Sequence, residues 1–306
     1  MKLSKYQLAV LALISTNIIW GASVPIFKWS LESVPPFTFA FLRFFLAALI
    51  LLPFTIHKLR ISRHDVISLF VLSFIGFFVH IGLLLFGLTI SSSVNASVIA
   101  TAAPVFFILG ALVLLKEKVK RAVVFGTVVS LIGVIIIILR PIFDHGLDGT
   151  IIGNLLFVLS TITFVIYTFL LKNYTTHLRA STVTFYLFFM AAVMFLPFFI
   201  IESSHQPISV LLSSQAILVI LFGALFTSVV GYILYNLAIR TIKASEIGIF
   251  LYVDPVVTIL VAVPLLGEHI TLSFILGSLL VILGIFVAEK RVQYHPVHKL
   301  FTQKTA

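Results

Sequence analysis

The chain contains one stretch of thirty residues twice, as PVFFILGALVLLKEKVKRAVVFGTVVSLIG at Pro104–Gly133 and as PVVTILVAVPLLGEHITLSFILGSLLVILG at Pro255–Gly284. The copies lie 151 residues apart and align without a gap, with ten identical positions. Apolar matches are common in so hydrophobic a chain, but the matched prolines, glutamates and glycines have special backbone or charge roles: Pro104/Pro255, Glu117/Glu268, Gly126/Gly277 and Gly133/Gly284. Each copy predicts an apolar helix broken by a proline, a turn around a glutamate, and a second helix with two glycines seven residues apart.

The composition indicates a protein that lies in a lipid bilayer. Hydrophobic residues make up 61% of the 306 residues and charged residues only 10%. A soluble domain of this size could not cover such a core with so little polar surface. The chain has no cysteine, which excludes disulfides and thiolate metal sites. The sequence has no phosphate loop, metal cluster or nucleophile elbow, so we expect no cofactor, no bound metal and no catalytic residue.

Apolar segments of about 20 residues are long enough to cross about 30 Å of hydrocarbon. By this criterion the sequence predicts an all-α integral membrane protein with ten transmembrane helices, at residues 8–27, 37–56, 66–88, 94–115, 122–139, 150–171, 181–201, 214–239, 246–266 and 272–289. The first segment also has features of a signal peptide, because Lys2 and Lys5 precede an apolar run. That run is longer than a typical signal sequence, so we interpret it as a transmembrane helix.

The lysines and arginines predict how these helices are oriented. With a cytoplasmic N-terminus, seventeen of the twenty lie on the cytoplasmic side, only Lys28 and Arg140 lie outside, and Arg43 lies within the second helix. This bias predicts a multi-pass protein of the cytoplasmic membrane with both termini inside. The anionic cytoplasmic leaflet also accounts for the net charge of +10, so we expect a lipid bilayer and no nucleic acid as partner.

The repeat extends beyond the opening stretch. At an offset of 144 residues, Lys28 matches Lys172 and Phe45 matches Phe189. The sequence therefore predicts a first repeat at 8–139, a second repeat at 150–289 and a cytoplasmic tail at 290–306. Each repeat holds five helices, and because five is odd the second must enter the membrane from the opposite side. Two inverted five-helix repeats are typical of secondary transporters, which bind substrate near the midplane between the halves.

Short motifs that occur in a fixed order carry a family resemblance: Trp20-Gly21, Leu42-Arg43-Phe44, Asp254-Pro255, and the Pro-(x)12-Glu spacing of Pro104/Glu117 and Pro255/Glu268. The chain resembles the EamA-type transporters of the drug/metabolite transporter superfamily over about residues 8–289. The resemblance implies a metabolite transporter, often an exporter of amino acids or related small molecules. The second repeat departs from the pattern, with Phe164 at the tryptophan position and Leu187 at the arginine position. We therefore expect the halves to differ in function.

Asp254 and Arg43 are the charged side chains that lie well inside predicted spans. A central aspartate costs roughly 2.5–3.5 kcal/mol, so Asp254 should face the bundle interior or water. There it could exchange a coupling proton, or helix-packing hydrogen bonds could hold it. Arg43 could bind a substrate carboxylate or pair with Asp254, or its long side chain could reach the membrane interface.

Other polar or aromatic side chains within or beside the spans are candidates for the lining of a substrate pocket: Asn17, Trp20, His80, Asn95, Tyr232, Tyr235, Asn236 and Tyr252. Interhelical hydrogen bonds or interfacial anchoring would explain each one as well. Pro104 and Pro255 could act as hinges, line a cavity or only kink a helix. The glycines indicate close helix packing, which could also support a homodimer. We expect Glu117 and Glu268 to cap helix ends or form turn ion pairs.

The sequence favours a secondary transporter that exports a small metabolite, such as an amino acid or related amphipathic compound, by alternating access. Proton coupling would use Asp254, whereas an uncoupled facilitator of the same fold would not need it. An integral-membrane enzyme would require polar residues gathered at one membrane face, and the chain has only scattered ones. Duplicated inverted halves have no obvious use in a membrane scaffold.

Overall fold

A computed structural model describes residues 4–56, 61–103, 105–106, 125–126, 128–129, 131–136, 149–174, 177–205, 211–242, 250–251, 253–270 and 272–289. Pro104, Glu117, Tyr252 and the predicted tail lie outside these residues, as do parts of the predicted helices at 94–115, 122–139 and 246–266. Within the described part of the chain all regular structure is helical.

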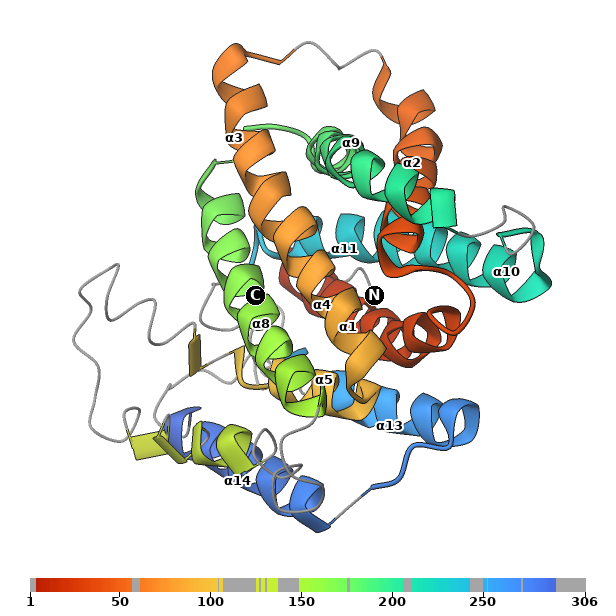
Figure 1. The fold of residues 1–306 in the computed structure, drawn as a ribbon. Helices are drawn as coiled ribbons and strands as arrows, with labels where there is room; N and C mark the ends of the chain where they lie inside the picture. Colours follow the sequence, from red (N-terminus) through yellow and green to blue (C-terminus); the bar gives the residue numbers. More distant parts are fainter. Residues whose placement is uncertain are drawn as a thin grey trace.

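The helices follow the order expected from the apolar segments (Figure 1). Two long spans are composite, because a π-helical segment (η2 or η4) joins two α-helices without a break. In chain order the elements are α1 (Lys5–Ser30), α2 (Pro36–Thr55), α3 (Arg63–Ser73), η2 (Phe74–Val79), α4 (His80–Ile90), α5 (Ser93–Ala100), α8 (Gly149–Tyr174), α9 (Ala180–His205), α10 (Ser214–Phe222), η4 (Gly223–Val230), α11 (Gly231–Ala238), α13 (Val253–Leu266) and α14 (Leu272–Glu289).

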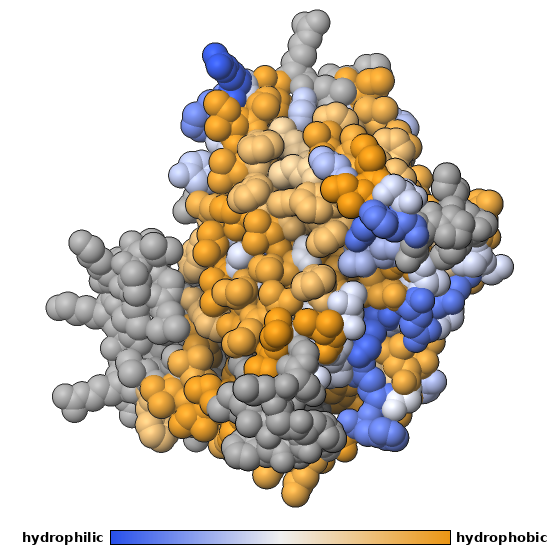
Figure 2. Space-filling view, viewed as in Figure 1, coloured by the Kyte–Doolittle hydropathy of each residue, from blue (hydrophilic) through white to orange (hydrophobic). Residues whose placement is uncertain are grey.

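Six helical runs among the described residues are long and apolar enough to cross a bilayer: Lys5–Ser30, Pro36–Thr55, Arg63–Ile90, Thr150–Leu171, Ala180–His205 and Ser214–Ala238. They correspond to the first, second, third, sixth, seventh and eighth predicted helices. Their outer faces remain apolar, as Figure 2 shows for one side of the molecule. Phe54, for example, is 75% exposed and Leu218 is 63% exposed. Contact with lipid explains so much exposed apolar surface, and the protein is a multi-pass membrane protein.

The two halves of the chain are intertwined rather than separate. The most extensive helix contacts each join a helix before residue 140 to one after it: α2 with α9, α1 with α11 and α13, and α4 with α8. Glycines allow the closest of these approaches. A Cβ atom on Gly87 would lie 2.6 Å from the ring of Phe157, and one on Gly153 would lie 2.5 Å from Cβ of Ser91. The α4–α8 contact therefore requires both glycines.

The predicted packing role of the repeat glycines is confirmed at one pair. A Cβ atom on Gly133 would lie 2.5 Å from the carbonyl oxygen of Gly277, so the helical residues 131–136 cross α14 in close contact at this point. The contact lies within one chain. These two glycines therefore give no support to a homodimer.

Partly buried carboxylates cap two helices. At the start of α5, Glu268 accepts hydrogen bonds from the backbone N–H groups of Ser93 and Val94, at 2.8 and 3.0 Å. At the start of α2, Glu202 accepts from the N–H groups of Phe37 and Thr38, at 3.3 and 2.6 Å. Both arrangements satisfy donors that a helix leaves unpaired and place negative charge at its positive end. The capping role expected for Glu268 is confirmed.

Candidate functional site

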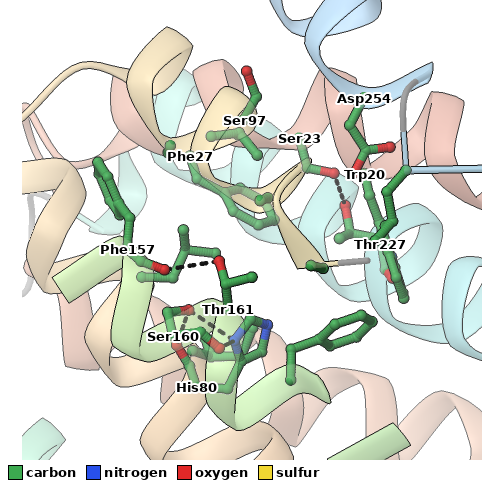
Figure 3. A pocket seen from close by; sticks show the side chains of 18 of the residues that line it. Trp20, Ser23, Phe27, His80, Ser97, Phe157, Ser160, Thr161, Thr227 and Asp254 are labelled. Atoms are coloured by element: carbon green, nitrogen blue, oxygen red, sulfur yellow. Dashed lines mark hydrogen bonds between the residues drawn. The ribbon is translucent and has the colours of Figure 1, made fainter. Parts of the chain in front are cut away.

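A cavity of about 100 Å³ lies between helices from both halves of the chain (Figure 3). Its wall is mostly aliphatic and aromatic, with hydroxyl groups and two charged side chains. The described residues that line it are Trp20, Ser23, Val24, Phe27, Arg43, His80, Ile81, Leu84, Ala96, Ser97, Ala100, Ala103, Phe157, Ser160, Thr161, Phe164, Thr227, Tyr232, Leu251 and Asp254. A lining of this kind, with a few polar groups in an apolar wall, is typical of a small-molecule site.

Arg43 is the cation of the cavity wall and is only 1% exposed. The guanidinium carbon lies 4.7 Å from the ring centre of Phe27 and 4.9 Å from that of Phe44. Its Nε atom donates a hydrogen bond to Oγ of Ser228 at 2.7 Å. Its Nη1 atom has no hydrogen-bond partner among the described residues. The side chain therefore does not extend to the membrane interface. The Nη1 atom of this buried cation is left to bind another group.

Asp254 is the acid of the cavity wall and is 8% exposed. It lies in the first turn of α13, so the described helix begins beside it instead of running through it as the sequence predicted. Its Oδ1 atom has no hydrogen-bond partner, and no ion pair joins it to Arg43 among the described residues. A Cβ atom on Gly21 would lie 2.7 Å from the Asp254 carbonyl oxygen, so glycine allows α1 to approach the acid.

The π-helical segment η4 organises the neighbouring wall. Trp20 donates its indole N–H to the carbonyl oxygen of Thr227 at 3.2 Å, and Ser23 shares a 2.9 Å hydrogen bond with the Thr227 hydroxyl. Thr227 is followed by Ser228, which holds Arg43. Adjacent residues of η4 thus contact two different helices, α1 and α2, and π-helical segments are common at functional sites.

His80 and Ser160 form a reciprocal pair on the side of the cavity away from Asp254 (Figure 3). Nδ1 of His80 lies 2.8 Å from the Ser160 carbonyl oxygen, and the Ser160 hydroxyl donates to the His80 carbonyl oxygen at 2.9 Å. Because a carbonyl only accepts, the ring proton is assigned to Nδ1. This leaves Nε2 of His80 as an acceptor for a solute in the cavity.

A polar cluster lies beside this cavity. Lys28, the residue after the lining residue Phe27, lies 3.3 Å from Glu268 Oε1 and donates to the carbonyl oxygen of Ser91 at 2.7 Å. The Ser91 hydroxyl donates to Asn154 Oδ1 at 2.7 Å. Together with the cap on α5, these contacts connect α1, α5, α8 and the turn between α13 and α14. Glu268 therefore caps α5 and also pairs with Lys28 of α1, rather than with a neighbour in its own turn.

A family model, the EamA-like transporter family, matches the chain twice, at residues 7–139 and 151–289. The chain belongs to the EamA-like transporter family. An uncharacterized transporter of Archaeoglobus fulgidus is 30% identical to it, over 92% of this chain and 98% of that protein. The uncharacterized transporter YetK of Bacillus subtilis is 28% identical, over 97% of this chain and 91% of that protein.

The fold of this EamA-like protein also matches a solved crystal structure with a TM-score of 0.67 and 17% sequence identity, over 93% of this chain and 98% of the other. The family predicted from the short motifs is confirmed, and so is a membrane transporter as the class of protein. The relatives are named as transporters rather than as enzymes.

Five of the predicted site residues of the EamA-like protein line the cavity: Trp20, Arg43, His80, Tyr232 and Asp254. Four others lie outside its wall: Asn17, Asn95, Tyr235 and Asn236. Asn17 donates its side-chain amide to the carbonyl oxygen of Leu13, and Tyr235 shares a 2.7 Å hydrogen bond with Thr168. Tyr235 supports the wall indirectly, because its ring centre lies 5.2 Å from that of Trp20.

Several polar residues of the EamA-like site were not anticipated from the sequence. Ser23, Ser160, Thr161 and Thr227 line the cavity, and Ser228 holds Arg43. Serine and threonine are common in transmembrane helices, where their hydroxyl groups often bond to a carbonyl one turn earlier. Ser228 differs from such residues because the neighbouring helix α2 places Arg43 within hydrogen-bond distance of its hydroxyl. Of the two predicted hinge prolines, Pro255 lies in the first turn of α13, and Pro104 lies outside the described residues.

Proposed function

We propose that this protein is a secondary transporter that moves a small metabolite across the cytoplasmic membrane by alternating access. The observation that carries the proposal is the cavity that holds Arg43 and Asp254, both buried and without an ion pair between them among the described residues. Charged groups inside a membrane are costly and are typical of substrate and ion pathways. A packing role would be expected to satisfy both groups within the protein.

Contacts between equivalent residues support the inverted repeat. At the offset of 144, Phe44 corresponds to Phe188 and Trp20 to Phe164. The ring centres of Phe44 and Phe188 lie 5.6 Å apart, and those of Trp20 and Phe164 lie 5.9 Å apart. Residues that touch their own equivalents lie close to a pseudo-two-fold axis. We propose ten transmembrane helices in two inverted repeats, at 8–139 and 150–289, with both termini in the cytoplasm.

Interrupted helices at the cavity support alternating access. At the offset of 151, the lining residues Ala100 and Ala103 correspond to Leu251 and Asp254. The α-helix α5 ends at Ala100, and α13 begins at Val253 after a 3₁₀ turn at residues 250–251. Interrupted helices of this kind line the substrate site in many transporters. We propose that the segments around Pro104 and Pro255 move during transport.

The cavity sets the character of the substrate. Its volume of about 100 Å³ is smaller than the roughly 150 Å³ that an apolar cavity needs to hold benzene, so in this conformation it suits a compact solute. Arg43 can face a carboxylate, and Asp254 can face an ammonium group or exchange a proton. We propose export of an amino acid or related amphipathic compound, coupled to protons through Asp254.

The cluster around Lys28 and Glu268 indicates which end of the cavity opens during alternating access. With the predicted orientation, Lys28 and Glu268 lie on the outer side, so their cluster separates the cavity from the outside. Transport to that side requires the cluster to open. Opening returns the partly buried Lys28 and Glu268 side chains to water, which offsets the loss of their ion pair.

Purified protein in liposomes tests the function. Counterflow of labelled amino acids is measured with and without a pH gradient. Saturable counterflow that a pH gradient drives uphill supports the coupled exporter. Saturable counterflow that does not respond to the pH gradient supports the uncoupled facilitator. Chemical conversion of a solute without net movement would overturn the transporter and support a membrane enzyme.

A further inference from the structure

The guanidinium of Arg43 is held in a fixed orientation by groups that do not neutralise it. The rings of Phe27 and Phe44 flank it, and Ser228 accepts from Nε. A Cβ atom on Gly223 of η4 would lie 3.3 Å from Cδ of Arg43, so glycine also leaves room for the aliphatic stem. With the stem, ring faces and Nε occupied, the free N–H edge at Nη1 is the part that can bind a solute.

The charge balance of the wall limits what that edge can accept. Among the described lining residues Arg43 is the one arginine or lysine, and Asp254 is the one carboxylate. A single guanidinium suits a single carboxylate, to which the unpartnered Nη1 can donate a charge-assisted hydrogen bond. A phosphate dianion would bring one more negative charge than a carboxylate into the apolar wall beside Asp254, which disfavours it. The geometry therefore favours a solute with one carboxylate.

We infer that Ser228 is a positioning residue for a carboxylate subsite at Arg43, and that the transported solute carries one carboxylate on a compact apolar body. The inference rests on the proposed function for the identity of the solute as cargo. The subsite itself stands on the contacts of Arg43. Ser228 does not touch the solute; it fixes the plane of the guanidinium through Nε.

Fluorescence of Trp20 gives a direct binding test. The chain has two tryptophans, so Trp29→Phe leaves Trp20 in the cavity wall as the reporter. The probes are propionate and isobutyrate, each compared with its uncharged amide of nearly the same shape. We expect the acids to change the fluorescence in a saturable way and the amides to do so far more weakly. Equal responses to acid and amide, or no response to either, would overturn the subsite.

Variants then separate positioning from packing. Without the Ser228 acceptor, binding has to order the guanidinium itself, so Ser228→Ala should weaken propionate binding by about two- to tenfold. Ser228→Thr should restore most of it, because the hydroxyl is kept. In an Arg43→Met background, propionate binding should be lost and Ser228→Ala should have no further effect.

Ser73 provides the matched control. It is a fully buried serine that donates to the carbonyl oxygen of Leu187, the residue equivalent to Arg43 in the other half. Ser73→Ala should lower thermal stability without changing propionate binding. If it weakens binding as much as Ser228→Ala does, Ser228 has only a packing role. If the protein binds the acids selectively but shows no counterflow, the carboxylate subsite stands and the transport function is contradicted. If it shows counterflow but no selectivity for the acids, the transport function stands and the subsite is contradicted.

Discussion

At the scale of single residues, Asp254 is the clearest test of coupling. Asp254→Asn keeps the shape and a hydrogen-bonding head group but cannot gain or lose a proton. We expect proton-driven uphill transport to vanish while downhill exchange continues, because substrate contacts are largely kept. Wild-type exchange should change with pH, and exchange by the variant should not. Uptake and counterflow in liposomes at a series of pH values measure both.

Asp65 is a suitable control for this experiment. It lies at the start of α3, where it bonds to Ser62 and to His177 at 2.8 Å, away from the cavity wall. Asp65→Asn should leave uphill transport close to the wild-type rate. If Asp254→Asn still concentrates its substrate against a gradient, Asp254 does not carry the coupling proton.

The residue types that are rare in membrane helices were the ones that sequence analysis could find. Arg43 and Asp254 stand out because charge inside a bilayer is costly, and Trp20 because of its motif. Asn17 is also a predicted pocket residue, because it is a polar side chain within a predicted span. Its amide instead bonds to Leu13 on its own helix. Whether a polar side chain in a span faces a solute or bonds to a backbone carbonyl depends on how the neighbouring helix packs against it.

At the scale of elements, the Lys28–Glu268 pair predicts how the outer end opens. Glu268→Gln keeps an acceptor for the cap on α5 but removes the charge that faces Lys28. We expect the outer end to open more often, so a cysteine at Ser97, one turn into α5 from Ser93, should react several-fold faster with an impermeant maleimide added outside. Lys28→Met should act in the same direction. The native chain has no cysteine to interfere.

Glu202→Gln is the matched control, because Glu202 caps α2 in the same way and has no lysine or arginine ion-pair partner among the described residues. It should not change labelling of the cysteine at position 97. Faster labelling in this control would mean that general loosening of helix ends, rather than loss of the ion pair, exposes the cavity. Unchanged labelling in Glu268→Gln would show that the pair does not hold this end closed.

The π-helical segments could not be foreseen. The sequence predicts single continuous helices at 66–88 and 214–239, and the structure has composite spans at Arg63–Ile90 and Ser214–Ala238. Most residues of both spans are apolar, so a shift of one residue in register changes the hydrophobic pattern little. The breaks near Pro104 and Pro255 were foreseeable because proline lacks an N–H group.

At the scale of the whole molecule, the inverted repeat makes a prediction about topology. Lys28 and Lys172 are equivalent in the two repeats but should lie on opposite sides of the membrane. A single cysteine at the exposed position of Glu32 should react with an impermeant reagent from outside, and one at the exposed position of Tyr174 from inside. Labelling of intact cells and of inverted vesicles measures this. Reaction of both cysteines from the same side would rule out the inverted arrangement.

The two caps on α2 and α5 also have a consequence for biosynthesis. Glu202 follows Thr38 by 164 residues, and Glu268 follows Ser93 by 175 residues. A ribosome completes both helices long before it makes either carboxylate. Until then the first N–H groups of each helix need acceptors from water or lipid head groups. The first half of the chain therefore cannot reach its final hydrogen bonding alone, and a nascent chain that stops before residue 268 leaves α5 without its acidic cap.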